Sequence, residues 1–338
     1  MVRRIRLAWV LSASVAFAVL SFSVAHADED ATQRQLRHRM EGLQASGRLT
    51  VDGVRISSVR LMAELYPQVR FERVWTDPKK VDELLRAVAD SRLNGLDPQD
   101  YYLDRLNRMR AELAGQRDVG KEVELDILLT DALARLAYNT YYGKVDPERI
   151  DRSINIDQAW TGARGATLAR EFLASKSLYQ RIAELRPQRP KYEQLRLALQ
   201  RYRRYEEAGG WERIAKGKVL SVGRSDPRVP AIRHRLAMTE DLAANLDDGS
   251  QLYDADVEKA VHRFQKRHRL PSGDLGSKTI TAMNVPVERR IDQIRVNMER
   301  ARWITRHVKP TQIVVNIAAF EIYLLKDGKR VWQNEAQV

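Results

Sequence analysis

Apolar residues recur at helical spacing over most of the chain between residues 76 and 305. The first clear helix is predicted to begin after Asp77-Pro78, because an aspartate caps the free N–H groups of a first turn and a proline fits inside it. Gly95 suits the left-handed conformation that ends a helix. Between these two points the apolar positions stand at i, i+3, i+4 and i+7, at Val81, Leu84, Leu85 and Val88.

The same spacing predicts more helices before residue 208, and no part of residues 60–208 alternates with a period of two for long. Residues 28–60 are more polar and predict one short helix followed by a loop. This half of the chain is therefore expected to be a helical domain. The segments expected to be helical are a short one after Asp97-Pro98, an apolar stripe from Leu125 to Leu136 that ends near Gly143, and residues 168–185 and 191–207.

A compact module is predicted next. Asp254 can cap a helix over residues 255–268, and Ser277 can cap a following one after a turn at residues 271–273. An earlier helix is predicted from Val229, Ile232 and Leu236, whereas residues 219–222 form either a short strand or an extended linker. Three short helices of this kind can pack as a small bundle.

A long helix is predicted for residues 287–305, and the pattern changes after Pro310. Residues 320–332 form a predicted β-hairpin whose turn contains Asp327-Gly328. The fold class expected for the whole chain is mainly α, with the start of a β-rich domain at its end.

The first residues have the layout of an export signal. Three arginines precede an apolar stretch over residues 7–24, and Ala25-His26-Ala27 offers the small residues that a signal peptidase recognises. We expect cleavage after Ala27 and a periplasmic protein without a membrane span after cleavage. The alternative is an uncleaved membrane anchor, because the apolar stretch is close to the shortest length that spans a bilayer.

Composition narrows the possible partners and chemistry. The 338 residues carry a formal net charge of +13, which suits an anionic partner, and export makes nucleic acid a poor candidate. There is no cysteine and no Gly-x-Ser-x-Gly turn, so the sequence has no motif for the usual nucleophiles of acyl transfer, and a dispersed Ser-His-Asp set is the alternative that is left. His262 and His268 stand six residues apart on one predicted helix and point to different faces, so they cannot share a metal ion. The sequence has no His-Glu-x-x-His motif and no phosphate-binding loop, so neither a metal nor a cofactor is expected.

Three stretches of the sequence contain distinctive motifs. They are LNGLDP at 93–98, LLTDA at 128–132 and GKVDP at 143–147; DPRVP at 226–230, FQKRH at 264–268, GSKT at 276–279 and NVP at 284–286; and RW at 302–303 with VVNI at 314–317. In this order, the three stretches resemble the periplasmic L,D-transpeptidases. The first resembles the helical scaffold domain of that family, the second its peptidoglycan-binding domain, and the third the approach to its catalytic β-domain.

The resemblance implies a domain order and a function. Full-length relatives join the stem peptides of peptidoglycan into 3–3 cross-links through a cysteine, and the family's catalytic histidine and Ser-His-Gly-Cys motif have no counterpart in this sequence. We therefore expect a peptidoglycan-binding protein of this family without catalytic residues of its own. The expected parts are a signal peptide at 1–27, a scaffold domain at 28–215, a peptidoglycan-binding domain at 216–286, a linker helix at 287–310 and a truncated catalytic domain at 311–338.

The candidate site is the end of the Phe-Gln helix, where basic side chains could meet the carboxylates of stem peptides. The same residues could instead form a solvated face without a ligand. Two other functions remain open: a piece of an active transpeptidase, and a non-catalytic wall adaptor or a protein that binds anionic lipid. The candidate substrate-binding residues are Gln265, Lys266, Arg267, His268 and Arg269.

Overall fold

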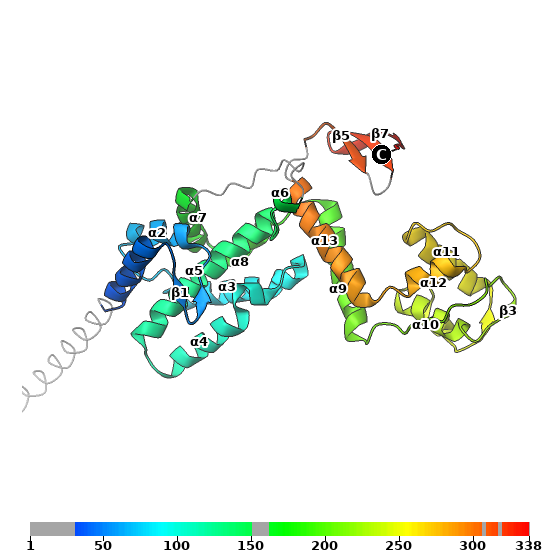
Figure 1. Cartoon of the computed structure of the whole chain (residues 1–338), viewed down its shortest axis with the longest axis horizontal. Coiled ribbons are helices and arrows are strands. Elements are labelled where there is room, and N and C mark those ends of the chain that lie inside the picture. The colour runs from blue at the N-terminus through cyan, green and yellow to red at the C-terminus, as the bar shows by residue number, and fades with distance from the viewer. Residues whose placement is uncertain (1–30, 151–161, 306–308, 317–319, 338) are drawn as a thin grey trace, which may run out of the picture. The chain divides into compact units, whose positions relative to one another are not determined.

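The computed structural model describes residues 31–150, 162–305, 309–316 and 320–337 (Figure 1). These residues are mainly α, as the sequence predicts, and their strands are short. They belong to two compact units, of which the second is Pro190–Met298 and the first comprises the residues on either side of it. None of the described helices is both long and apolar enough to cross a bilayer. The expected signal segment at residues 1–27 lies outside the described residues.

Helices dominate the first unit, and α5 is the longest of them. A small antiparallel hairpin, β1 with β2, precedes them, and its turn at Asp52-Gly53 uses positive φ at both residues. The sequence predicted only a loop there. The elements are a helix over 31–46, β1 (Thr50–Val51), β2 (Val54–Arg55), α2 (Val59–Gln68), α3 (Pro78–Asp90), η1 (Ser91–Asn94), η2 (Pro98–Tyr101), α4 (Leu103–Gly115), α5 (Val119–Tyr142), α6 (Pro147–Ile150), α7 (Gly162–Ala174) and α8 (Leu178–Glu184).

Local capping signals place the helix ends of this unit. Asp77 accepts a hydrogen bond from the N–H of Lys79 at 2.9 Å, so the predicted start of α3 is confirmed. Asp97 caps η2 in the same way through the N–H of Gln99, at 3.0 Å. Gly95 ends η1 with φ 76°, the left-handed conformation that was predicted for it.

The prediction of one continuous helix over residues 168–185 is wrong. The chain forms α7 and α8 instead, with a break at Ser175-Lys176-Ser177. The Ser177 hydroxyl accepts a hydrogen bond from the N–H of Gln180 at 3.3 Å and begins α8. Glu83 of α3 accepts the N–H of Leu178 at 2.7 Å, so a contact distant in sequence fixes the break.

A buried carboxylate on α5 organises the centre of this unit. Asp126 is 2% exposed and accepts hydrogen bonds from the Trp75 N–H at 3.0 Å and from the Tyr66 hydroxyl at 2.8 Å. Burial raises the pKa of Asp126 to about 6. The Asp126 side chain thus holds the segment that leads into α3 against α5. Burial favours the neutral form of this side chain over the charged form.

The last turns of α13 (Val287–Thr305) also pack in the first unit. Glu299 accepts the N–H of Val145 at 2.8 Å and pairs with Arg302 at 2.9 Å. Arg302 is 1% exposed and donates to the carbonyl of Asn94 at 2.5 Å. Gly143 lies beneath this contact with φ 100°, where a Cβ atom would stand 2.5 Å from a carboxylate oxygen of Glu299.

The second unit contains the predicted bundle of α10, α11 and α12, and Figure 1 shows these three helices grouped together. Asp254 caps α11 by accepting the N–H groups of Asp256 and Val257, as predicted. The predicted capping by Ser277 is wrong, because α12 begins one residue earlier with Gly276 as its cap. The elements are α9 (Pro190–Glu207), β3 (Arg224–Ser225), α10 (Val229–Met238), η3 (Ala244–Leu246), β4 (Leu252–Tyr253), α11 (Ala255–Arg267), α12 (Ser277–Met283) and most of α13.

Two further predictions concern residues 219–222 and the sheet near the end of the sequence. Within residues 219–222, Leu220 forms an isolated antiparallel bridge with Leu275, and Val222 begins a turn. The sheet near the end of the sequence is antiparallel in the order β5 (Gln312–Asn316), β6 (Glu321–Lys326), β7 (Lys329–Glu335). Its predicted Asp-Gly turn is confirmed, with φ 50° at Asp327 and 74° at Gly328.

Candidate ligand-binding site

The five candidate residues at the end of α11 point in different directions. Lys266 and Arg269 are exposed, whereas Gln265 is 1% exposed. The Gln265 side-chain N–H group donates to the Gly273 carbonyl at 3.0 Å, and its oxygen accepts the Gly273 N–H at 3.1 Å. Gln265 therefore holds the loop that leads to α12, and its amide is occupied within the protein.

Arg267 and His268 reach a cluster of basic and aromatic side chains. Arg267 pairs with Asp241, which is 6% exposed, and donates to the Tyr202 hydroxyl at 3.3 Å. The His268 ring lies 4.2 Å from the Phe264 ring, centroid to centroid. Two of the five candidate residues thus lie together, on the side of α11 that carries Phe264.

A buried arginine from α10 forms the centre of this cluster. Arg235 is 1% exposed, and its guanidinium carbon lies 3.6 Å from the centroid of the Trp211 ring, a close cation–π contact. Its Nε donates to the Met283 carbonyl at 3.1 Å, and one terminal nitrogen donates to the Thr239 hydroxyl at 3.0 Å. Burial lowers the pKa of Arg235 to about 10, so the side chain still carries its positive charge at neutral pH.

Arg290, near the start of α13, adds a third guanidinium. It donates to the Ala282 carbonyl at 2.9 Å and to the Gln293 side chain at 3.1 Å. Burial, chiefly, and the nearby charge of Arg267 lower its pKa. The cluster of Arg235, Arg267, His268 and Arg290 is called the basic cluster below.

The basic cluster carries more positive charge than its neighbours neutralise. The carboxylate of Asp241 pairs directly with Arg267. It also accepts a hydrogen bond from the Thr239 hydroxyl, which in turn accepts one from Arg235. Burial, followed by the charges of Arg290, Arg267 and Arg235, lowers the pKa of His268 to about 3. The imidazole is therefore neutral at ordinary pH, and among the residues that the structure describes the three guanidinium groups have one bound carboxylate, Asp241.

Three buried nitrogens of the basic cluster have no hydrogen-bond partner among the described residues. They are a terminal nitrogen of Arg235, Nε of Arg290 and Nε2 of His268. Each unmade hydrogen bond to a buried polar atom costs roughly 1–3 kcal/mol. A carboxylate would satisfy guanidinium N–H groups and offset the surplus charge, so an anionic ligand suits this arrangement.

Sequence patterns identified only part of the basic cluster. Arg235 and Arg290 come from α10 and α13, and their place beside α11 depends on the tertiary fold. Trp211 and Tyr202 supply the aromatic wall, with ring centroids 6.4 Å apart. The tract Arg-Tyr-Arg-Arg-Tyr at residues 201–205, followed by Trp211, was the available sequence signal for that wall.

Two family models match parts of this chain. Residues 60–199 match a family model described as a scaffold domain. Residues 225–283 match a putative peptidoglycan-binding domain. The chain carries a peptidoglycan-binding domain. Arg235, Arg267 and His268 lie within that match, which supports the cell wall as a partner, and the two domains together are consistent with the architecture of L,D-transpeptidases. No curated protein gives a match.

Proposed function

We propose that this protein is exported to the periplasm and binds peptidoglycan, with the basic cluster receiving carboxylates of the stem peptides. The observation that carries the proposal is a surplus of partly buried positive charge with unpaired N–H donors, most of it within a segment that matches a putative peptidoglycan-binding domain. Charge-assisted hydrogen bonds from arginine to carboxylate are among the stronger and more directional ones in proteins.

The relation to L,D-transpeptidases belongs to the same proposal. It is supported by the order of the two matched domains and by the motifs at residues 302–303 and 314–317. In this proposal β5, β6 and β7 correspond to the start of the transpeptidase domain. No residue of this sequence is assigned the cysteine nucleophile of that family, because the sequence contains no cysteine.

Co-sedimentation of the full chain with purified peptidoglycan sacculi tests wall binding. The informative variant is Arg267→Gln, which removes one guanidinium of the basic cluster. The matched control is Lys259→Gln on the same helix, whose side chain is 66% exposed and pairs with Asp256. We expect the Arg267 variant to bind at least about tenfold more weakly, since a hydrogen bond to a charged group contributes roughly 1.5–3 kcal/mol. The Lys259 variant should bind within about twofold of wild type.

Two further samples identify the chemistry that is recognised. Sacculi whose carboxylates have been converted to amides should retain little protein, and vesicles of anionic phospholipid should retain less than untreated sacculi. Equal retention by amidated sacculi would contradict the proposed carboxylate recognition. Stronger retention by vesicles would favour a lipid-binding protein instead. Circular dichroism spectra of both variants check that their folds are intact.

A further inference from the structure

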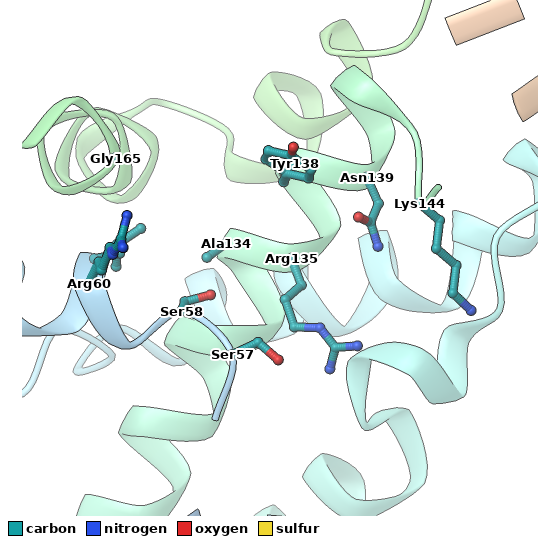
Figure 2. Close-up of a pocket in the computed structure, with 10 residues that line it drawn as sticks. Ser57, Ser58, Arg60, Ala134, Arg135, Tyr138, Asn139, Lys144 and Gly165 are labelled. Carbon is teal, nitrogen blue, oxygen red and sulfur yellow. The ribbon is translucent and has the colours of Figure 1, made fainter. Parts of the chain in front are cut away.

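The pocket between the start of α2 and α5 in the first unit is lined by basic side chains that do not converge. Its volume is about 440 Å³. Figure 2 shows the Arg60 and Arg135 side chains on opposite sides of the start of α2. Asp131 accepts the N–H groups of Ser57 at 3.1 Å and Ser58 at 2.7 Å, so these donors are already occupied. The pocket therefore offers no shared site for an anion, and the surface that stands out is one face of the β5–β6–β7 sheet.

This face of the sheet is apolar and open to solvent. Ile313 and Val315 of β5 lie on it and are 66% and 50% exposed. The strand register places Leu324 of β6 opposite Ile313, and Trp332 of β7 opposite Leu324. Because successive side chains of a strand point to opposite faces, these side chains share one face, which is called the apolar sheet face below. Its apolar members are Ile313, Val315, Ile322, Leu324 and Trp332.

The opposite face of the same sheet is more polar and partly closed. Tyr323 lies there and is 7% exposed, and the guanidinium carbon of Arg330 lies 4.0 Å from the centroid of its ring. Gln312 and Gln333 share this face with Tyr323. Exposed apolar side chains gathered on one face typically mark a surface that contacts a protein or a membrane, so a partner is expected on the apolar sheet face.

The charged side chains of the apolar sheet face are two lysines. Lys326 and Lys329 are exposed and stand directly opposite each other beside the hairpin turn. Like charges in this position repel each other, so an anionic partner would stabilise them. The acidic residues Glu321 and Glu335 are paired on the opposite face of the sheet. The apolar sheet face therefore combines an apolar surface with positive charge at one end.

We propose that the apolar sheet face docks on the surface of an anionic phospholipid bilayer. A bilayer offers phosphate groups to the two lysines and acyl chains to the aliphatic side chains, and tryptophan is favoured at the boundary between them. Peptidoglycan carries carboxylates but has no extended apolar surface for this face. The proposal rests on the proposed export, which brings the protein close to lipid. It goes beyond the proposed wall binding, because it uses none of the residues of the basic cluster.

A single fluorescent label on the full chain tests this docking directly, because the sequence contains no cysteine of its own. Ile313→Cys places the label on the apolar sheet face, and Gln312→Cys places it on the opposite face of the same strand. The label is NBD, whose emission rises in an apolar environment. The vesicles contain either phosphatidylglycerol with phosphatidylcholine or phosphatidylcholine alone. We expect a saturable rise in emission at position 313 with the anionic vesicles, and little change at position 312 or with the neutral vesicles.

Three results of this experiment would overturn the proposal. The first is unchanged emission at position 313 with anionic vesicles, and the second is an equal rise at positions 312 and 313. The third is a rise at position 313 that depends on protein concentration without vesicles, because a second copy of the chain would then cover the face.

Two neighbouring substitutions in β7 of the unlabelled chain provide a charge-matched comparison. Trp332→Glu should weaken binding to anionic vesicles at least about tenfold, because it removes apolar area and adds a charge that headgroups repel. Gln333→Glu adds the same charge on the opposite face and should weaken binding less than about threefold. Equal weakening by the two variants would contradict docking through the apolar sheet face. Circular dichroism spectra check that both variants are folded.

The two proposals can fail separately. Sacculus binding by wild type without any response of position 313 to vesicles removes only the docking of the apolar sheet face. A response of position 313 to anionic vesicles, with no sacculus binding by wild type, removes only the proposed wall binding. Sacculus binding should be the same for Trp332→Glu and wild type, since Trp332 lies outside the basic cluster.

Discussion

The substitution Gly143→Ala tests how the last turns of α13 are held in the first unit. Gly143 ends α5 with φ 100°, a conformation that L-residues rarely adopt. A Cβ atom there would lie 2.5 Å from a carboxylate oxygen of Glu299 and 2.8 Å from the Trp303 ring nitrogen. Glu299 cannot simply swing away, because it holds the Val145 N–H at 2.8 Å and Arg302 at 2.9 Å.

The expected cost has two parts. A residue with a side chain in a sparsely populated backbone region costs about 1–3 kcal/mol. Overpacking a filled site costs about 1–3 kcal/mol more. We therefore expect Gly143→Ala to lower the free energy of unfolding of the first unit by about 2–6 kcal/mol.

Urea unfolding followed by circular dichroism measures this change, with two controls that separate its parts. Gly47 also has positive φ, at 66°, but no atom lies within 4 Å of its Cβ position, so Gly47→Ala isolates the backbone cost. Gly115 lies in α4 with open space around it, so Gly115→Ala should be neutral or slightly stabilising. A Gly143→Ala protein no less stable than Gly47→Ala would refute the close packing of Glu299 and Trp303 against Gly143.

Two other substitutions test buried polar groups. Gln265→Leu should destabilise the second unit by about 1–3 kcal/mol, because the Gly273 N–H and the Thr279 hydroxyl lose their partner. Urea unfolding measures this change, and the surface variant Lys266→Leu should shift the unfolding midpoint little. Asp126→Asn tests a pH effect. The pKa of Asp126 in the folded protein, about 6, lies above its ordinary value of 3.8, so the folded state holds the proton of this carboxyl more tightly than the unfolded state. The stability that this proton contributes is fully present below pH 3.8 and is lost as pH rises through 6. The stability of wild type relative to Asp126→Asn should therefore fall by on the order of 3 kcal/mol between pH 4 and pH 7, and a difference that is constant with pH would contradict the raised pKa.

The features that could be predicted from the sequence are those fixed by residues close together in the chain. The caps at Asp77, Asp97 and Asp254, the left-handed Gly95 and the Asp327-Gly328 turn all depend on the chain within a few residues. The mainly helical fold follows from apolar spacing of the same short range. The break before α8 was missed because its second half is fixed by Glu83, far away in sequence.

Most of the candidate site depends on contacts that are distant in sequence. Arg267 and His268 could be proposed from their helix, but Arg235 and Arg290 come from other helices and resemble ordinary surface arginines in the sequence. Gln265 was predicted in the substrate-binding set, and the structure gives its amide a role within the fold.

The most direct test of the central proposal is the response of the Arg290 and Arg235 side-chain Nε–H signals in NMR spectra of the full chain to a soluble disaccharide-tetrapeptide from peptidoglycan. Arg290 Nε has no hydrogen-bond partner among the described residues, so a bound carboxylate should shift its signal and slow its exchange with water. The Arg235 Nε–H, already bound to the Met283 carbonyl, should shift less. Unchanged signals at saturating ligand, or the same shifts with the amidated fragment, would contradict carboxylate binding at the basic cluster.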